Sequence, residues 1–227
     1  MTNEPARVQV GAAPARARGG GSRRLRGSPP IGSIPGIGHQ IMAKTPFLTD
    51  IQTLRKRARQ HIDEGSVTAG YAADREVVLK LLNDSLATEL VCVLRYRRHH
   101  FMARGIHSQS VAQEFLDHSN EELGHADQIA ERIVQLGGAP DFAPGGLASR
   151  SHAEYVEGGS LASMIEEDLV AERVAIDSYR DIIKYLGELD PTTRRMMEGI
   201  LAVEEEHADD LADLLVAFPA ESKAAKR

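Results

Sequence analysis

The sequence predicts an all-α protein organised around a four-helix bundle. Aromatic residues make up only 4% of the 227 residues and Trp is absent, whereas Leu, Ala, Glu and Arg are abundant, a composition that favours helices. The pattern Glu-x-x-His also occurs twice, at Glu122 and His125 and again at Glu204 and His207. Both copies lie in segments whose apolar residues recur at spacings of three and four, which indicates two helical hairpins of one design.

The N-terminal segment differs in composition from the rest of the chain. Residues 1–44 are rich in Gly, Pro, Ala and Arg without apolar periodicity, so we expect a disordered arm. Residues 1–60 carry eleven Lys and Arg against two acidic residues, a net charge of +9, which leaves −15 for the remainder of a chain with net charge −6. The arm is therefore basic and the body acidic.

Three roles stay open for this basic arm. It could be a solubilising tail, or it could bind DNA or another polyanion through salt-sensitive phosphate contacts. The short sequence from Ile31 to Ile34, Ile-Gly-Ser-Ile, also resembles the peptides that load cargo into encapsulin shells, which would make the arm a targeting segment.

A short leading helix is expected after the arm. Thr45 followed by Pro46 is a typical helix start, and an apolar stripe continues to about Glu64. The stripe consists of Phe47, Ile51, Leu54, Ala58 and Ile62. The expected organisation is thus an arm over 1–44, a leading helix and linker over 45–73, one bundle domain over 74–218 and a tail over 219–227.

Four longer helices are predicted over 74–103, 110–136, 160–186 and 191–218. The segment between the second and third is long enough to run along the bundle, so the third helix starts at the opposite end from a short hairpin. The side chains expected to face inward are Val78, Leu82, Leu86, Val93, Tyr96, Phe115, His118, Ile129, Leu136, Ile165, Leu169, Ile176, Tyr179, Ile183, Leu186, Met197, Ile200, Leu211 and Leu214.

Each Glu-x-x-His pair has a glutamate upstream at a matching distance. Glu89 lies 33 residues before Glu122, and Glu172 lies 32 residues before Glu204. A hairpin that turns midway, near Gly105 or Glu188, rises about 1.5 Å per residue in each direction and returns the paired residues to one level. All six residues also fall on inward-facing stripes: Glu89, Glu122, His125, Glu172, Glu204 and His207.

Four carboxylates in one core repel each other, and each loses several kcal/mol of solvation free energy on burial. Two divalent cations would balance the four negative charges, with neutral imidazoles completing the ligand set. A site that is rich in carboxylates, has one imidazole per metal and contains no thiolate favours iron or manganese.

These motifs resemble those of ferritin-like di-iron proteins, and of the bacterioferritins in particular, over residues 74–217. The matching segments are 83–90, 122–125, 168–172 and 204–209. The resemblance implies that Glu122 and Glu204 bridge two irons. It also implies that Glu89 and His125 complete one iron site and that Glu172 and His207 complete the other.

Four neighbouring residues bear on this interpretation. Tyr96 stands at the position of the tyrosine that supports an iron ligand in the family, and Tyr179 has the same spacing from Glu172, so either hydroxyl could orient a carboxylate. We expect His118 to be a hydrogen-bonded interior residue rather than a third ligand, and Cys92 to be buried without binding metal.

The chain departs from the bacterioferritin pattern in two places. The methionine that ligates haem in the family would occupy position 123, which is Leu123 here, so no haem is expected. The nine residues after Phe218 do not match the family's short fifth helix, which leaves cage assembly open. No apolar run approaches about 18 residues, and Arg23 and Arg24 precede no apolar export signal, so we expect a cytoplasmic protein.

The resemblance implies a ferroxidase that oxidises Fe²⁺ with O₂ or H₂O₂ for iron storage or detoxification. Two Fe ions per subunit are expected, with manganese as the alternative metal, in a homo-oligomer for which closure into a cage stays open. One alternative is a di-manganese catalase or di-iron oxidase on the same bundle. The other is a starvation-type DNA-binding protein that uses the basic arm.

Overall fold

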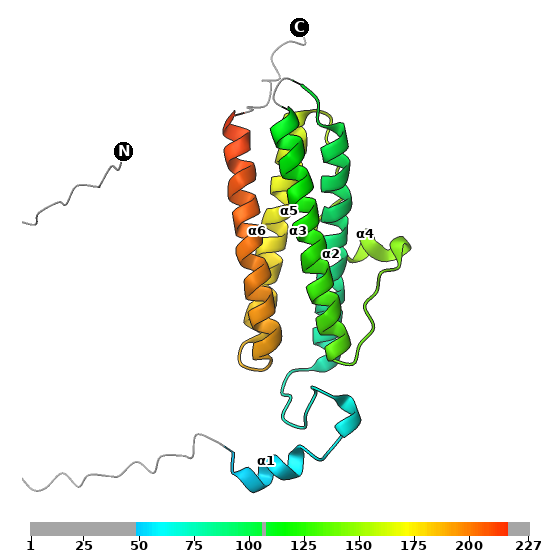
Figure 1. Cartoon of the computed structure of the whole chain (residues 1–227), viewed down its shortest axis with the longest axis vertical. Helices are drawn as coiled ribbons and strands as arrows, with labels where there is room; N and C mark the ends of the chain where they lie inside the picture. The colour runs from blue at the N-terminus through cyan, green and yellow to red at the C-terminus, as the bar shows by residue number, and fades with distance from the viewer. Residues whose placement is uncertain (1–48, 106–107, 218–227) are drawn as a thin grey trace, which may run out of the picture. The chain divides into compact units, whose positions relative to one another are not determined.

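The computed structural model describes residues 49–105 and 108–217, and these residues are helical without any strand (Figure 1). The long helices are α2 (Arg75–Met102), α3 (Ser108–Gln135), α5 (Leu161–Leu186) and α6 (Pro191–Ala217). Helix α2 packs on α3 and α5 packs on α6, and the two pairs form the predicted four-helix bundle. The predicted arm over 1–44, the tail over 219–227 and the predicted helix end at Phe218 lie outside the described residues.

The helix ends follow from local side-chain chemistry. Asp74 accepts hydrogen bonds from the backbone N–H groups of the first turn of α2, and Ser160 does the same for α5. Asp190 accepts from the Thr193 N–H at 2.9 Å at the start of α6. Gly187, with φ of 43°, ends α5 in a conformation that a residue with a side chain rarely adopts.

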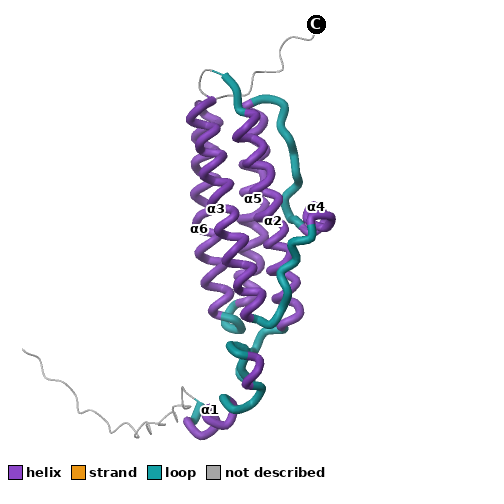
Figure 2. Tube along the Cα trace, turned by 45° about the vertical axis from the view of Figure 1, so that its right-hand side comes forward, coloured by secondary structure: helices purple, strands orange, loops and turns teal. Residues whose placement is uncertain are grey.

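A long crossover joins α3 to α5 and runs along the bundle, as the sequence predicts (Figure 2). It contains a 3₁₀ turn (Pro144–Gly146) and a one-turn helix, α4 (Leu147–Arg150), which the sequence analysis missed. The crossover is fastened to α2 by two hydrogen bonds from its backbone N–H groups: Asp141 to Asn83 Oδ1 at 2.8 Å and His152 to Thr88 Oγ1 at 2.9 Å.

The leading helix is shorter than predicted. Helix α1 spans Ile51–Arg57 with Asp50 as its cap, and after a break only a 3₁₀ turn (Ile62–Glu64) follows, so the prediction of one continuous helix to Glu64 is wrong. Thr45, Pro46 and Phe47 lie outside the described residues. Within the described part of the chain the apolar stripe is not covered, since Ile51, Leu54 and Ile62 are 57%, 45% and 81% exposed. A helix this short gains little stability without such packing.

The apolar core of the bundle is divided into two clusters. One cluster gathers around Leu82, Ile129 and Met197, and the other around Phe115 and Ile165. Most side chains predicted to face inward are buried, and Val93, Leu169, Ile183 and Leu214 are half-buried. The polar layer that separates the two clusters contains the predicted ligand set. Within 49–105 and 108–217, no helix has the length and apolar character of a bilayer-crossing segment.

Candidate metal centre

All six residues singled out by their spacing meet in the middle of the bundle. Helix α2 contributes Glu89, α3 contributes Glu122 and His125, α5 contributes Glu172, and α6 contributes Glu204 and His207. Every one of them is buried, with at most 5% of its surface exposed. The two Glu-x-x-His pairs therefore face each other across the bundle from α3 and α6.

The six side chains form two overlapping groups of four that are each the size of a metal site. Glu89 and His125 belong to one group, and Glu172 and His207 belong to the other. Glu122 and Glu204 belong to both. Within each group the candidate ligand atoms lie within 4.8 Å of one another. This geometry suits two cations that share two carboxylates.

The imidazoles present equivalent atoms to the centre. His125 Nδ1 lies 3.0 Å from Glu204 Oε1 and 3.5 Å from Glu89 Oε2. His207 Nδ1 lies 3.5 Å from Glu122 Oε1 and 3.6 Å from Glu204 Oε2. In both halves, Nδ1 is thus the nitrogen that is placed to bind a cation.

The centre contains buried polar atoms that lack hydrogen-bond partners among the described residues. They are Glu89 Oε2, Glu122 Oε1, Glu172 Oε2, both carboxylate oxygens of Glu204, and Nδ1 of His125 and of His207. An unpaired buried polar atom costs about 1–3 kcal/mol, and more when it is charged. Seven such atoms converging on one point fit a pair of bound cations, which would give each of them a partner.

Electrostatics in the centre favours protons where cations are absent. Burial and the charge of Glu122 raise the pKa of Glu89 to about 8, and the same two causes raise the pKa of Glu172. Burial alone would lower the pKa of both imidazoles. Contacts with Glu122 and Glu204 outweigh burial, so the pKa of His125 rises and that of His207 rises to about 11. Cations that bind here must displace these protons.

Two buried tyrosines support the outer glutamates from the opposite helix pair. The Tyr96 hydroxyl on α2 donates to Glu172 on α5, and the Tyr179 hydroxyl on α5 donates to Glu89 on α2. Burial raises the pKa of both phenols, so each keeps its proton and remains a donor. The second oxygen of each glutamate, Oε2, is buried without a hydrogen bond to any described residue.

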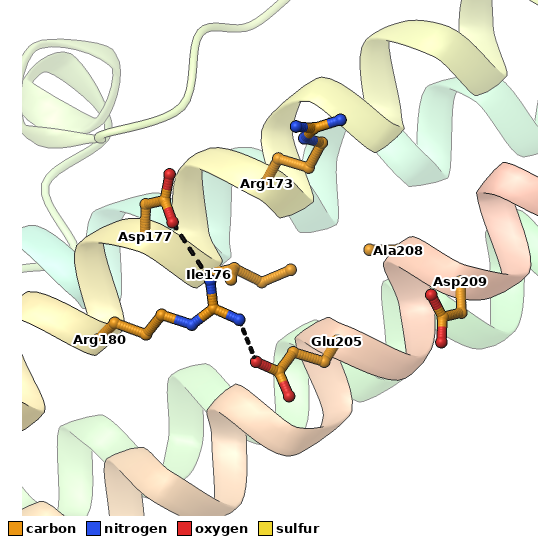
Figure 3. A pocket seen from close by; sticks show the side chains of 7 residues that line it. All are labelled: Arg173, Ile176, Asp177, Arg180, Glu205, Ala208 and Asp209. Carbon is orange, nitrogen blue, oxygen red and sulfur yellow. Dashed lines mark hydrogen bonds and ion pairs between the residues drawn. The ribbon is translucent and has the colours of Figure 1, made fainter.

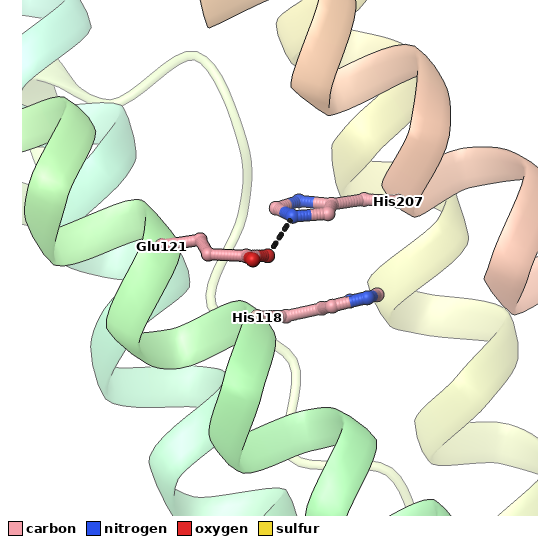
Figure 4. Close-up of side chains that lie close together, drawn as sticks. All are labelled: His118, Glu121 and His207. Carbon is pink, nitrogen blue, oxygen red and sulfur yellow. Dashed lines mark hydrogen bonds and ion pairs between the residues drawn. The ribbon is translucent and has the colours of Figure 1, made fainter.

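One imidazole has further polar neighbours (Figure 4). Glu121 Oε2 lies 2.7 Å from His207 Nε2, and the His118 ring stacks on the His207 ring with centroids 4.0 Å apart. His118 is buried and its Nδ1 lies 3.3 Å from the Tyr96 hydroxyl, which confirms the predicted hydrogen-bonded interior residue. Sequence reasoning missed Glu121, because nothing in the local pattern distinguishes it from the other acidic residues of its helix.

Other residues considered from the sequence lie outside the ligand set. Cys92 is buried, as expected, and its Sγ lies 3.7 Å from Arg95 Nη2. Leu123 is 41% exposed beside Glu122. On the outer face of α5 and α6, a polar pocket of about 420 Å³ includes Arg180, which pairs with both Asp177 and Glu205 (Figure 3). This pocket contains none of the six predicted ligands.

Comparisons with known proteins agree on one family. A family model described as a ferritin-like domain matches residues 79–220. A nutrient stress-induced DNA-binding protein from Nostoc sp. is 34% identical over 74% of this chain and 92% of its own length. A bacterioferritin from Mycobacterium avium is 32% identical over 59% of this chain and 80% of its own length. Among solved structures, a dodecameric thioferritin from Bacteroides fragilis has a TM-score of 0.63 and 30% identity, covering 65% of this chain and 89% of its own.

Proposed function

The chain belongs to the ferritin-like domain family, and from this premise we propose that it is a ferroxidase that oxidises Fe²⁺ to Fe³⁺ at a di-iron centre within each subunit, for iron storage or detoxification. The observation that supports the proposal most directly is the convergence of unpaired ligand atoms in two groups that share Glu122 and Glu204.

The chain's own residues have separable tasks in this reaction. Glu122 and Glu204 would hold both cations, the four glutamates together would balance the charge of the two cations, and His125 and His207 would each add a neutral nitrogen. Tyr96 and Tyr179 fix the orientation of the outer glutamates. When two Fe²⁺ are bound they supply two electrons, enough to reduce O₂ to H₂O₂ or H₂O₂ to two waters, with two protons consumed in either case.

The test is Glu122→Ala. A bridging carboxylate serves both cations, so the variant should lose fast Fe²⁺ oxidation by about 100-fold or more, beyond the usual effect of residues that only orient ligands. Stopped-flow absorbance of Fe³⁺ formation measures this rate, and iron analysis gives the number of ions bound. Glu205→Ala is the matched control, because Glu205 adjoins Glu204 on α6 but faces the outer pocket.

Glu89→Ala should weaken binding of one iron more than the other. If Glu122→Ala keeps two irons and oxidises them at the original rate, the di-iron proposal is wrong. If the purified protein instead binds manganese selectively and decomposes H₂O₂ without oxidising Fe²⁺, the alternative di-manganese catalase holds.

We also propose that subunits assemble into a homo-oligomeric cage. The support is the resemblance to the thioferritin from Bacteroides fragilis, a protein that is itself described as dodecameric. Native mass spectrometry of the full chain measures the assembly state. A monomer or dimer at micromolar concentration would contradict the cage.

A second candidate function is DNA binding by the basic arm. Residues 1–60 have a net charge of +9, and the relative from Nostoc sp. is described as a DNA-binding protein. The full-length protein should therefore retard duplex DNA at low salt, and binding should fall steeply as salt is added. A chain that lacks residues 1–44 should bind weakly. Equal binding by the two forms, or none by either, would contradict this role.

A further inference from the structure

The two halves of the centre correspond to each other residue by residue. Two sets of four residues match in the same order along the chain. The first set is Glu89, Tyr96, Glu122 and His125, and the second is Glu172, Tyr179, Glu204 and His207. The ligand atoms and the tyrosine hydrogen bonds follow the same correspondence. A difference between the halves must therefore arise from residues that surround the ligands.

Two surrounding positions break the correspondence. Glu121, which directly precedes one motif glutamate, is matched by Val203, which precedes the other. His118, one turn earlier on α3, is matched by Ile200 on α6. At these two positions α3 thus carries a carboxylate and an imidazole, whereas α6 carries two apolar side chains.

The polar pair holds His207 from two directions. Its Nε2 lies 2.7 Å from Glu121 Oε2, and its ring lies nearly parallel to the His118 ring, at an interplanar angle of 19°. A carboxylate that accepts the Nε2 proton leaves the lone pair on Nδ1, the nitrogen that faces the centre. The contact also increases the basicity of that nitrogen and fixes the ring plane.

His125 lacks an equivalent support. Its contacts with the centre all involve Nδ1, and no protein group within the described part of the chain forms a hydrogen bond with Nε2. Val203 offers no acceptor at the matching position. Holding the His125 ring in its metal-binding orientation therefore costs more conformational entropy than holding the His207 ring. The ligating nitrogen of His125 is also less basic than that of His207.

We propose that Glu121 is a positioning residue that makes the two cation sites unequal: the half with Glu172 and His207 binds a divalent cation first and retains it, while the half with Glu89 and His125 exchanges its cation. This inference rests on the proposed di-metal centre and specifies how that centre fills. The exchangeable half is then the one that takes up and releases substrate iron.

The experiment is an anaerobic titration of the full-length, metal-free protein with Co²⁺, followed by visible absorption and calorimetry. The wild type should bind two ions with stepwise dissociation constants that differ by about 10-fold or more, since loss of a partner that orients a ligand typically costs about 10- to 100-fold in affinity. Glu172→Ala should remove the tighter step, and Glu89→Ala the weaker one.

Exchanging the two surrounding residues tests Glu121 itself. Glu121→Val copies the other half and should bring the tighter constant close to the weaker one, whereas Glu121→Gln, which keeps an acceptor oxygen, should restore part of the loss. Val203→Glu should strengthen the weaker step. Glu205→Val is the control, because it removes a neighbouring acidic residue that faces the outer pocket, and it should leave both steps unchanged.

Three outcomes would overturn the inference. Two equal steps in the wild type would show that the halves are equivalent, and unchanged constants in Glu121→Val would show that Glu121 does not support His207. Loss of a third Co²⁺ in that variant, with the first two unaffected, would make Glu121 a ligand of an additional ion. Failure of the wild type to bind any pair of ions would contradict the proposed function instead.

Discussion

The bundle buries two groups of charged side chains whose hydrogen bonding is opposite in character. In the cluster of Arg95, Asp168 and His99, named here the paired cluster, the charged atoms have partners. Arg95 Nε and His99 Nδ1 each lie 2.7 Å from an oxygen of Asp168, and the remaining nitrogens of both side chains reach backbone carbonyls of the crossover or Cys92. In the candidate metal centre, seven polar atoms lack hydrogen-bond partners among the described residues.

The difference separates two uses of buried charge. The paired cluster ties α2, α5 and the crossover together, and its charges are already compensated. In the candidate metal centre, in contrast, seven atoms lack hydrogen bonds with described residues although imidazole and carboxylate atoms lie as close as 3.0 Å, and burying charged groups with incomplete hydrogen bonding costs free energy. We infer that buried charge with complete pairing maintains the architecture, and that buried charge without it marks where cations bind.

The largest expected effect is on the stability of the paired cluster. Asp168→Ala leaves Arg95 and His99 buried without their carboxylate, and breaking a buried ion pair in this way costs about 3–5 kcal/mol of unfolding free energy. Urea unfolding of the metal-free protein, followed by circular dichroism at one protein concentration, measures the loss. Asp177→Ala, at an exposed site on the same helix, should change stability by less than about 0.5 kcal/mol. If Asp168→Ala lowered the free energy of unfolding by no more than a surface substitution does, the paired cluster would not stabilise the fold, and its contrast with the candidate metal centre would disappear.

The metal centre should respond in the opposite sense. Burial raises the pKa of Glu172, as do the charges of Glu122 and Glu204 that crowd it, and removing Glu172 relieves this repulsion, so metal-free Glu172→Ala should unfold no more easily than the metal-free wild type. Added cation stabilises the wild type by about 2.7 kcal/mol per site when its concentration is a hundred times the dissociation constant, and the variant should lose most of this gain. Paired melts with EDTA and with Mn²⁺ give both quantities. A variant that is much less stable even in EDTA would assign Glu172 to the fold.

The meeting of the six side chains was predictable because their pattern repeats along the sequence. The two Glu-x-x-His pairs and their upstream glutamates fix both the helical faces and the levels at which the six side chains meet. Asp74 and Ser160 mark helix starts by local rules that need no tertiary information. Tyr96 and Tyr179 follow from the same spacing, although the crossing of each hydroxyl to the other helix pair emerges only in three dimensions.

The paired cluster could not be predicted in the same way. Asp168 lies within a recognised motif, but its role depends on Arg95, 73 residues earlier in the chain, and on carbonyls of a crossover without regular structure. The extent of α1 was also misjudged, because its apolar stripe predicts a buried face and no partner for that face is found among the described residues. Periodicity indicates which side of a helix is apolar, and it does not indicate whether anything covers that side.

The pH dependence of cation binding should sharpen the comparison further. The pKa of Glu89 is raised to about 8 and that of His207 to about 11, so both groups hold protons at pH 7 in the metal-free centre, and a cation must displace them. Affinity should therefore rise with pH, by about 1.4 kcal/mol per pH unit for each proton displaced. Mn²⁺ titrations at pH 6, 7 and 8, with an indicator dye to count released protons, test this. Affinity that is independent of pH would contradict the protonated centre.

The smallest expected effect concerns a second fully paired group, at the start of α6. Asp190 is bound by Arg132, Thr193 and Tyr71. Burial would raise its pKa, but the hydrogen bonds from Thr193 and Tyr71 and the charge of Arg132 outweigh burial and lower it. A lowered pKa means that the ionised group stabilises the folded state above its unfolded pKa of about 3.9, and that this contribution disappears as pH falls through the folded value.

Asp190→Asn keeps an oxygen to cap the helix but loses the charge, so it should cost about 1 kcal/mol at pH 7. Because acid neutralises the wild-type carboxylate as well, the difference between the two proteins should shrink steadily below pH 4. Urea unfolding at pH 7 and at pH 3 measures both values, with Asp181→Asn as the control because Asp181 is an exposed acidic residue on α5. A difference that stays constant to pH 3 would mean that the charge of Asp190 does not stabilise the fold. Complete hydrogen bonding and ion pairing would then not distinguish the group around Asp190 from the candidate metal centre.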